Sequence, residues 1–183
     1  MLESVHIQNF RLFKEFHIDN LAHVADDRRF IGIVRDVDTD VISSWQSAKD
    51  RIERTNLGYQ VPSNPQIGGV IIEAPNENLP RIGVWLMPDN QVIGELEDFV
   101  RLCIPSDNPL IPFADKILDE IENEQLHRYK EKRSKAFVYT WLAWQREPDI
   151  DMRKNFKQGT LSAETAIAQD FVSWLNQLFN PQS

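Results

Sequence analysis

Apolar runs that end abruptly in charged residues dominate the first half of the chain. The clearest run covers residues 30–34, Phe-Ile-Gly-Ile-Val, and carboxylates follow it at every second position, as Asp36, Asp38 and Asp40. An uninterrupted apolar run bounded by charge predicts a strand buried on both faces, as in the interior of a parallel sheet. We therefore expect a central strand that delivers three acidic residues to its carboxyl end.

Two further apolar runs, residues 70–72 and 81–87, predict additional central strands. Nearer the start of the chain, two short alternating segments, residues 2–10 and 14–18, predict an antiparallel pair. This N-terminal β-hairpin is expected to pack on the edge of the sheet or to extend it. Together with helical patterns elsewhere in the chain, these strands predict an α/β fold.

Helical periodicity fills most of the remaining sequence. Residues 41–56 and 94–103 have apolar side chains near helical spacing, and the chain from Phe113 onward is predicted to be mostly helical, with a loop at residues 154–159. Aromatic side chains that recur at this period are typical of helix-packing core rather than of a ligand pocket. The three predicted core stripes are Phe113, Ile117, Leu118 and Ile121; Ala136, Phe137, Thr140, Trp141 and Trp144; and Ile167, Phe171, Trp174, Leu175 and Leu178.

Composition narrows the classes of function. The chain has 183 residues, a formal net charge of −8 and no Lys/Arg block, so broad electrostatic attraction to nucleic acid is not predicted. A bound cation could still engage phosphates, because it can dominate the local charge. The single Cys103 excludes an internal disulfide and a multi-cysteine zinc site. Neither a signal peptide nor a membrane span is recognisable, so we expect a cytoplasmic protein with no membrane partner.

The acidic residues after the first predicted strand are the main candidates for chemistry. In open α/β sheets, ligands bind just beyond the carboxyl ends of the strands. Carboxylates gathered there repel one another unless a cation or protons neutralise them, and Mg²⁺ takes oxygen ligands of this kind. The alternative is a solvated acidic loop in which Asp40 simply caps the next helix. Similarly, Glu95, Glu97 and Asp98 open a predicted helix, where the helix dipole accounts for at least one of them.

The first residues resemble a known family of ATPases. Leu2-Glu-Ser-Val-His-Ile-Gln-Asn-Phe-Arg-Leu-Phe-Lys is similar to the opening hairpin of ATPases of the RecF, SMC and OLD (overcoming lysogenisation defect) kind. In that family a glycine-rich phosphate loop soon follows, but this sequence contains no Gly-x-x-x-x-Gly-Lys-Ser/Thr. Residues 1–24 are therefore interpreted as an ATPase-like hairpin remnant, and no ATPase activity is expected.

A second resemblance covers most of the remaining chain, which we treat as one domain over residues 25–183 with a helical C-terminal extension. Four stretches carry it: Gly32-Ile-Val-Arg-Asp-Val-Asp, Arg81-Ile-Gly-Val-Trp-Leu-Met-Pro-Asp-Asn, Gly94-Glu-Leu-Glu-Asp and Lys132-Arg-Ser-Lys-Ala-Phe. In this order and spacing they resemble an uncharacterised family of Toprim-like domains related to the OLD nucleases. The resemblance implies a partial Toprim-like (Rossmann-like) sheet, followed by a helical C-terminal half, and a divalent cation, Mg²⁺ or Mn²⁺.

The same resemblance implies roles for individual residues. Asp36 and Asp38 match the metal-binding pair, and Glu95 or Glu97 matches a later acidic position. We assign Glu95 as a further metal ligand and Glu97 to catalysis. Lys135 matches a basic residue that neutralises a phosphate or a leaving oxygen, and it is the second catalytic candidate. The glutamate that Toprim enzymes carry after their first strand has no counterpart here.

Two hypotheses about function follow. The first is a Toprim-like, divalent-metal-binding domain that engages nucleic acid through the metal and is weak or degenerate in phosphodiester cleavage. The alternative is a non-catalytic interaction module that pairs with an ATPase or with itself as a homo-oligomer. The missing first-motif glutamate and the missing phosphate loop favour the alternative, whereas the strand-end carboxylates favour the first.

Overall fold

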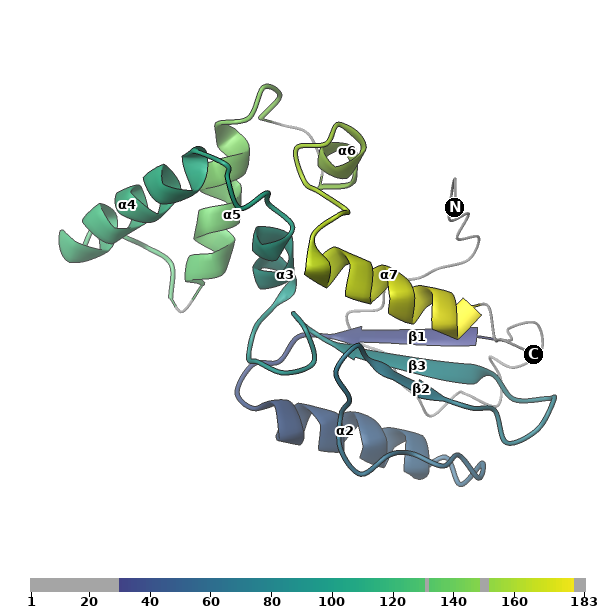
Figure 1. Cartoon of the computed structure of the whole chain (residues 1–183). Helices are drawn as coiled ribbons and strands as arrows, with labels where there is room; N and C mark the ends of the chain where they lie inside the picture. The colour runs from purple at the N-terminus through teal and green to yellow at the C-terminus, as the bar shows by residue number, and fades with distance from the viewer. Residues whose placement is uncertain (1–29, 131, 149–151, 180–183) are drawn as a thin grey trace.

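The computed structural model describes residues 30–130, 132–148 and 152–179. Within these ranges the chain forms a three-stranded sheet and six helices, so the predicted α/β fold is confirmed (Figure 1). The predicted N-terminal hairpin lies outside the described residues. The elements are β1 (Phe30–Arg35), α2 (Val41–Glu53), β2 (Val70–Ile72), β3 (Arg81–Leu86), α3 (Leu96–Leu102), α4 (Leu110–Asn123), α5 (Arg133–Ala143), α6 (Met152–Lys157) and α7 (Ala166–Phe179).

The sheet has the strand order β1-β3-β2. β1 runs parallel to β3, with Phe30 opposite Arg81 and Arg35 opposite Leu86, whereas β2 is antiparallel to β3. Because β1 and β3 are parallel neighbours, their carboxyl ends lie side by side, and the helical group α3–α6 extends beyond them (Figure 1). We call this end of the sheet, residues 36–40 and 87–98, the carboxyl edge.

The position of β1 corrects one prediction. Its apolar sequence predicts burial on both faces, but β1 is an edge strand of the described sheet and all its residues are half-buried. The fully buried strand is β3, where every residue after Arg81 is buried. An apolar run indicates that both faces of a strand pack against other side chains. It does not indicate whether the strand is hydrogen-bonded to one neighbouring strand or to two.

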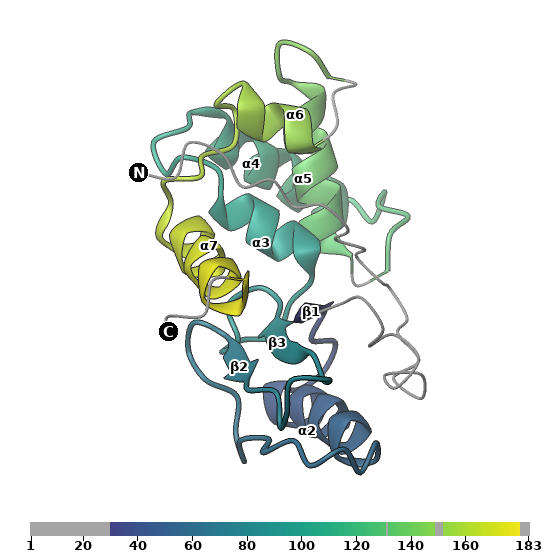
Figure 2. The same ribbon diagram turned by 90° about the vertical axis from the view of Figure 1, so that its right-hand side faces the viewer.

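Helices cover the two faces of the sheet (Figures 1 and 2). Alternate β3 side chains point to opposite faces: Val84 packs in a cluster with Trp45 of α2, whereas Trp85 packs in a cluster with Trp174 of α7. The α2 cluster comprises Val37, Trp45, Ala48, Ile52, Tyr59, Val70, Ile72, Ile82, Val84 and Leu86.

Glycines allow α7 to lie close to the strands. An added Cβ on Gly83 would lie 2.9 Å from both Leu178 Cδ2 and Trp174 Cζ2. At Gly69, where φ is +85°, an added Cβ would lie 2.4 Å from Trp174 Cδ1. The Trp174 indole N–H donates to the Val70 carbonyl oxygen at 3.3 Å. Trp174 is thereby fixed against the sheet by both packing and a hydrogen bond.

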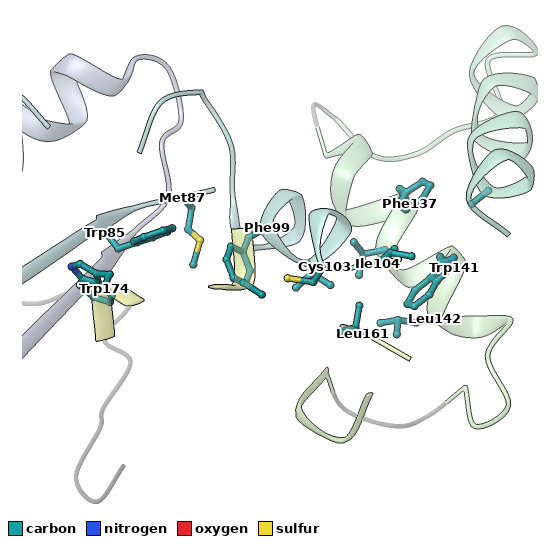
Figure 3. Close-up of a cluster of buried hydrophobic side chains, with 14 of the residues drawn as sticks. Trp85, Met87, Phe99, Cys103, Ile104, Phe137, Trp141, Leu142, Leu161 and Trp174 are labelled. Atoms are coloured by element: carbon teal, nitrogen blue, oxygen red, sulfur yellow. The ribbon is translucent and has the colours of Figure 1, made fainter. Parts of the chain in front are cut away.

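The core on the α7 side continues into the helical half. A row of buried side chains runs from Trp85 through Phe99 and Cys103 to Phe137 and Trp141 (Figure 3). Burial raises the pKa of the Cys103 thiol to about 11, so this cysteine is a structural part of the core rather than a nucleophile. The helical half therefore shares its core with the sheet, which fixes where α3 and α5 sit at the carboxyl edge.

The core stripes of the helical half are confirmed only in part. Trp141, Trp174 and Leu178 are fully buried, but the α4 side chains Phe113 and Ile117 are 61% and 38% exposed. In α4 the buried positions are Ala114 and Leu118. Trp144 is 40% exposed. Residues 154–159, predicted as a loop, instead begin within helix α6.

The two corrections in α4 have one cause. α4 lies on the outside of the helical group, where its described contacts are mainly with α5 (Figure 1). A helix that packs against one other helix buries only part of its apolar face, and the remaining apolar side chains stay exposed. Within the described ranges no helix is long and apolar enough to cross a bilayer.

Candidate functional site at the carboxyl edge

A short antiparallel contact brings Asp36 and Asp38, two of the three metal-ligand candidates, beside the start of α3. Val37 and Gly94 form a β-bridge through two backbone hydrogen bonds, of 2.8 and 3.0 Å. Val37 is buried in the α2 cluster, and the residues on either side of it, Asp36 and Asp38, are exposed. The backbone N–H of Leu96 donates to Asp36 Oδ1 at 3.2 Å. Asp36 is therefore held directly against the first turn of α3.

Local sequence explains why the chain turns in this way. The backbone N–H of Glu95, the residue before α3, donates to Asp98 Oδ2 at 2.7 Å, which is one half of a capping box. Gly94 precedes it, and an added Cβ there would lie 2.8 Å from Pro88 Cδ and 2.9 Å from Asp98 Oδ2. Only glycine at position 94 therefore lets the chain pass this close to Pro88 and to the Asp98 side chain.

The first turn of α5 lies opposite these acidic residues and supplies cations. Lys132 Nζ is 2.7 Å from Glu95 Oε2, and Lys135 Nζ is 3.1 Å from Glu97 Oε1. Between the two lysines, the Ser134 hydroxyl donates to the Asp98 carboxylate. Three segments that are distant in sequence, the end of β1, the start of α3 and the start of α5, therefore meet at the carboxyl edge.

We call Asp36, Asp38, Glu95, Glu97, Lys132 and Lys135 the edge cluster. Its members differ in burial: Glu97 is only 7% exposed, whereas the lysine side chains are 52% and 45% exposed. An acid buried to this degree is stable when a cation faces it. Lys135 takes that place in the structure.

The electrostatics confirm that the members of the edge cluster affect one another. Asp36 is an exposed residue, but the partial burial of its carboxyl group raises its pKa; the Leu96 N–H opposes this, and the negative charges of Glu95, Glu97 and Asp38 raise the pKa further. The hydrogen bond to Glu95 raises the pKa of Lys132, to which Asp38 and Asp36 also contribute. Excess negative charge therefore persists around Asp36 even with both lysines in place.

Asp40 has a different role. It is the N-cap of α2, where its carboxylate accepts a hydrogen bond from the Ser43 backbone N–H at 2.6 Å. The hydrogen bonds from Ser43 lower the pKa of Asp40. Capping, which was the alternative reading of the three aspartates, is therefore correct for Asp40, and only Asp36 and Asp38 belong to the edge cluster.

The donor set has the right chemistry for a hard cation, but its side chains are not arranged as ligands. Carboxylate oxygens are the ligands that Mg²⁺ prefers. Among the described residues, however, no three or more His, Cys, Asp or Glu side chains converge closely enough to hold a metal ion. Glu95 and Glu97 are directed to lysines instead. The structure thus has an ion-paired cluster in which Asp36 and Asp38 lie outside the two lysine pairs.

Sequence reasoning missed some residues of this region. Lys132 lies three positions before Lys135, so both fall on one side of α5, and this helical spacing is the signal that could have identified it. Asn90 is buried, and its side-chain oxygen accepts a hydrogen bond from the Leu86 N–H at 2.7 Å, which closes the end of β3. No periodic pattern marks a single buried amide of this kind.

The fold and the site define an α/β domain with a carboxylate–lysine cluster at the carboxyl edge of its sheet. A family model described as "Protein of unknown function (DUF3226)" matches residues 6–180, so the chain belongs to this family. No curated protein and no solved structure matches the chain significantly.

Proposed function

We propose that this protein is a Toprim-like, divalent-metal-binding domain, related to the OLD-family nucleases and weak or degenerate in phosphodiester cleavage. One observation carries the proposal. The five residues to which the resemblance gives roles, in three separate stretches of sequence, all lie in the edge cluster. Unrelated acidic residues of a solvated surface would have no reason to converge with a matching lysine.

The roles follow from position and charge. Asp36 and Asp38 are the first ligands of the cation, because they lie outside the lysine pairs and carry the unbalanced charge. Glu95 adds a further ligand. A bound Mg²⁺ or Mn²⁺ would supply Lewis-acid stabilisation of charge on a phosphoryl oxygen.

The two remaining candidates are the catalytic ones. Lys135 would neutralise a phosphate oxygen, and the buried Glu97 lies beside it. In the structure Lys135 Nζ lies 3.1 Å from Glu97 Oε1, and this ion pair makes both side chains less available to a substrate. Weak cleavage, with a preference for Mn²⁺ as the more tolerant ion, is therefore expected.

The direct test is calorimetric titration of the full chain with Mn²⁺ and Mg²⁺. We expect the wild type to bind, and Asp36→Asn/Asp38→Asn to bind at least tenfold more weakly. Asp107→Asn is the matched control, because Asp107 is an exposed acid outside the edge cluster, and its affinity should equal that of the wild type. Absence of binding in the wild type, or equal affinity in the double variant, would reject the proposal.

A second candidate function is a non-catalytic module that pairs with an ATPase or with itself. The observation that favours it is the exposed apolar side of α4, where Phe113 and Ile117 face outward. Exposed apolar side chains that share a helix face often mark interaction surfaces. Size-exclusion chromatography with light scattering tests self-pairing: a monomer at all concentrations, with Mn²⁺-dependent DNA cleavage, would contradict this alternative.

A further inference from the structure

We propose that the outer edge of β1, the side of the strand away from β3, is a strand-binding surface, and that residues 14–18 of the same chain occupy it as an antiparallel strand. Residues 14–18 lie outside the described part of the chain. The predicted hairpin would then extend the sheet beyond β1, with residues 2–10 as its outermost strand. The inference does not depend on the proposed function.

The backbone of β1 has one open side. The Arg35 carbonyl oxygen accepts a hydrogen bond from the Met87 N–H at 2.8 Å, so the backbone groups of Arg35 point toward β3. Successive residues of a strand alternate in this direction. The backbone groups of Gly32 and Val34 therefore point away from β3, to the outer edge. Among the described residues, nothing pairs with that side of β1.

The surroundings of β1 make an empty edge unfavourable. Phe30 and Val34 pack against the core on the α7 side, and Ile31 and Ile33 pack against the α2 cluster. The N–H and C=O groups of the outer edge therefore lie close to apolar side chains on both faces, where a missing hydrogen bond is costly. From Phe30 to Val34 the strand has no charge and no proline, which are the features that commonly keep an edge strand unpaired.

The opposite edge of the sheet is less suited to a further strand. β2 has only three residues, and its Val70 carbonyl oxygen already accepts the Trp174 indole N–H at 3.3 Å. A strand of this length with one carbonyl engaged offers few hydrogen bonds to a neighbour. The outer edge of β1 is therefore the place where the sheet can grow.

The same chain supplies a fitting strand close by. Residues 14–18, Lys-Glu-Phe-His-Ile, alternate polar and apolar side chains, as a strand with one buried face does. Only eleven residues, 19–29, connect them to Phe30. The family model begins at residue 6, so this segment belongs to the same family domain as the sheet. A segment on so short a connection has a high effective concentration at β1, which favours it over a separate molecule.

Connection length and charge both favour the antiparallel direction. A parallel strand needs a crossover of about a dozen residues or more, usually with a helix, and residues 19–29 are shorter than that. In the antiparallel direction Ile18 lies near Phe30, and Lys14 and Arg11 lie near the carboxyl edge. The four carboxylates and two ammonium groups of the edge cluster have a net formal charge of −2, which these two cations complement.

The test measures amide hydrogen exchange in β1 of the full chain by NMR. Alternate residues of the strand are matched controls, because the N–H groups of Ile31 and Ile33 point to β3 and those of Gly32 and Val34 point to the outer edge. We expect all four amides to be protected to a similar degree. Exchange at Gly32 and Val34 that is about tenfold or more faster than at Ile31 and Ile33 would overturn the inference.

Nuclear Overhauser contacts in the same sample identify the occupant. We expect them to join the backbones of residues 14–18 and β1 in antiparallel register. Contacts between β1 and any other segment would overturn the inference. So would protection of the two outward-facing amides that increases with protein concentration, because it would show that a second copy occupies the edge.

Proline variants then remove the partner strand. In Phe16→Pro/His17→Pro the two outward-facing amides should exchange about tenfold or more faster, because proline cannot donate to the ladder. Asp26→Pro, in the connecting segment, is the matched control and should leave them protected. Unchanged exchange of these amides in the double variant, with Ile33 still protected, would show that residues 14–18 are not the partner strand. If Ile33 also loses protection, the sheet itself is lost in that variant, and the wild-type contacts decide.

Discussion

The sheet face covered by α7 and the carboxyl edge lie next to each other and are built from opposite kinds of residue. On the face, Trp85, Trp174 and Leu178 are fully buried around glycines that leave no space for a methyl group. In the edge cluster at the carboxyl edge, four carboxylates lie near two half-exposed lysines, and the charge is not balanced. Contacts on the α7 face stabilise the fold. At the carboxyl edge the carboxylates repel one another, and a bound cation could reduce that repulsion.

This contrast indicates that stability and binding are separable in the molecule. Substitutions on the α7 face should lower the free energy of unfolding strongly. Substitutions at the edge should change it little and should alter cation affinity instead. Four predictions examine the contrast, beginning with the largest effect.

Trp174→Ala should lower the free energy of unfolding by about 3–5 kcal/mol, because it removes a fully buried indole together with its hydrogen bond to Val70. Trp144→Ala is the comparison: Trp144 is 40% exposed, so its loss should lower the free energy of unfolding by a smaller amount, about 1–2 kcal/mol. Urea unfolding followed by circular dichroism measures both. Similar losses in the two variants would show that α7 does not pack on the sheet as described.

Gly83→Ala should cost about 1–3 kcal/mol, because the new methyl group would lie 2.9 Å from Leu178 Cδ2 and Trp174 Cζ2. Combining it with Leu178→Ala provides space for that methyl group. The double variant should therefore lose less stability than the sum of the two single losses, in the same urea experiment. Strict additivity would mean that Gly83 and Leu178 are not in contact.

Asp36→Asn should give the smallest effect, a slight gain in stability at pH 7. The pKa of Asp36 is raised in the folded chain, so folding favours the protonated form, and stability falls as the pH rises through this raised value. Asparagine has no charge and so avoids this loss of stability. The variant's advantage over the wild type should disappear below about pH 4, where Asp36 becomes protonated in the folded and the unfolded chain alike.

Asp40→Asn provides the comparison of opposite sign. The pKa of Asp40 is lowered by Ser43, so its contribution is present at neutral pH and is lost as the pH falls. The Asp40 variant should therefore be less stable than the wild type at pH 7 and should approach it in acid. Urea midpoints measured between pH 3 and 7 test both variants, and a change of the same sign in both would contradict the assignment of these charges.

The sequence predicted the main elements of the fold because hydrophobic period and capping are local signals. Residues 30–34, 70–72 and 81–87 match the three described strands to within one residue. It did not predict which strand is central or that β2 is antiparallel, since neighbours in a sheet depend on long-range pairing. It also assigned too much core to α4, because the apolar spacing at Phe113 and Ile117 carries no information on how many helices surround them.

The members of the candidate site could be predicted in part. Parallel neighbours place their carboxyl ends together, and this rule accounts for Asp36 and Asp38 lying beside Glu95. The pairing of the glutamates with Lys132 and Lys135 could not be predicted, because it depends on where α5 packs against α3. The metal, the nuclease activity and the partners stay predictions.

The hydrogen bond from Trp174 to Val70 also bears on how the chain is made. The two residues are 104 positions apart, and Arg81 bonds to the Gln177 carbonyl 96 positions later. At a synthesis rate of about 5–20 residues per second, β2 would wait about 5–20 s for α7 to appear. Throughout that interval the tryptophan-bearing face of β3 has no cover from α7. The nascent polypeptide is therefore expected to depend on holding chaperones until α7 emerges from the ribosome.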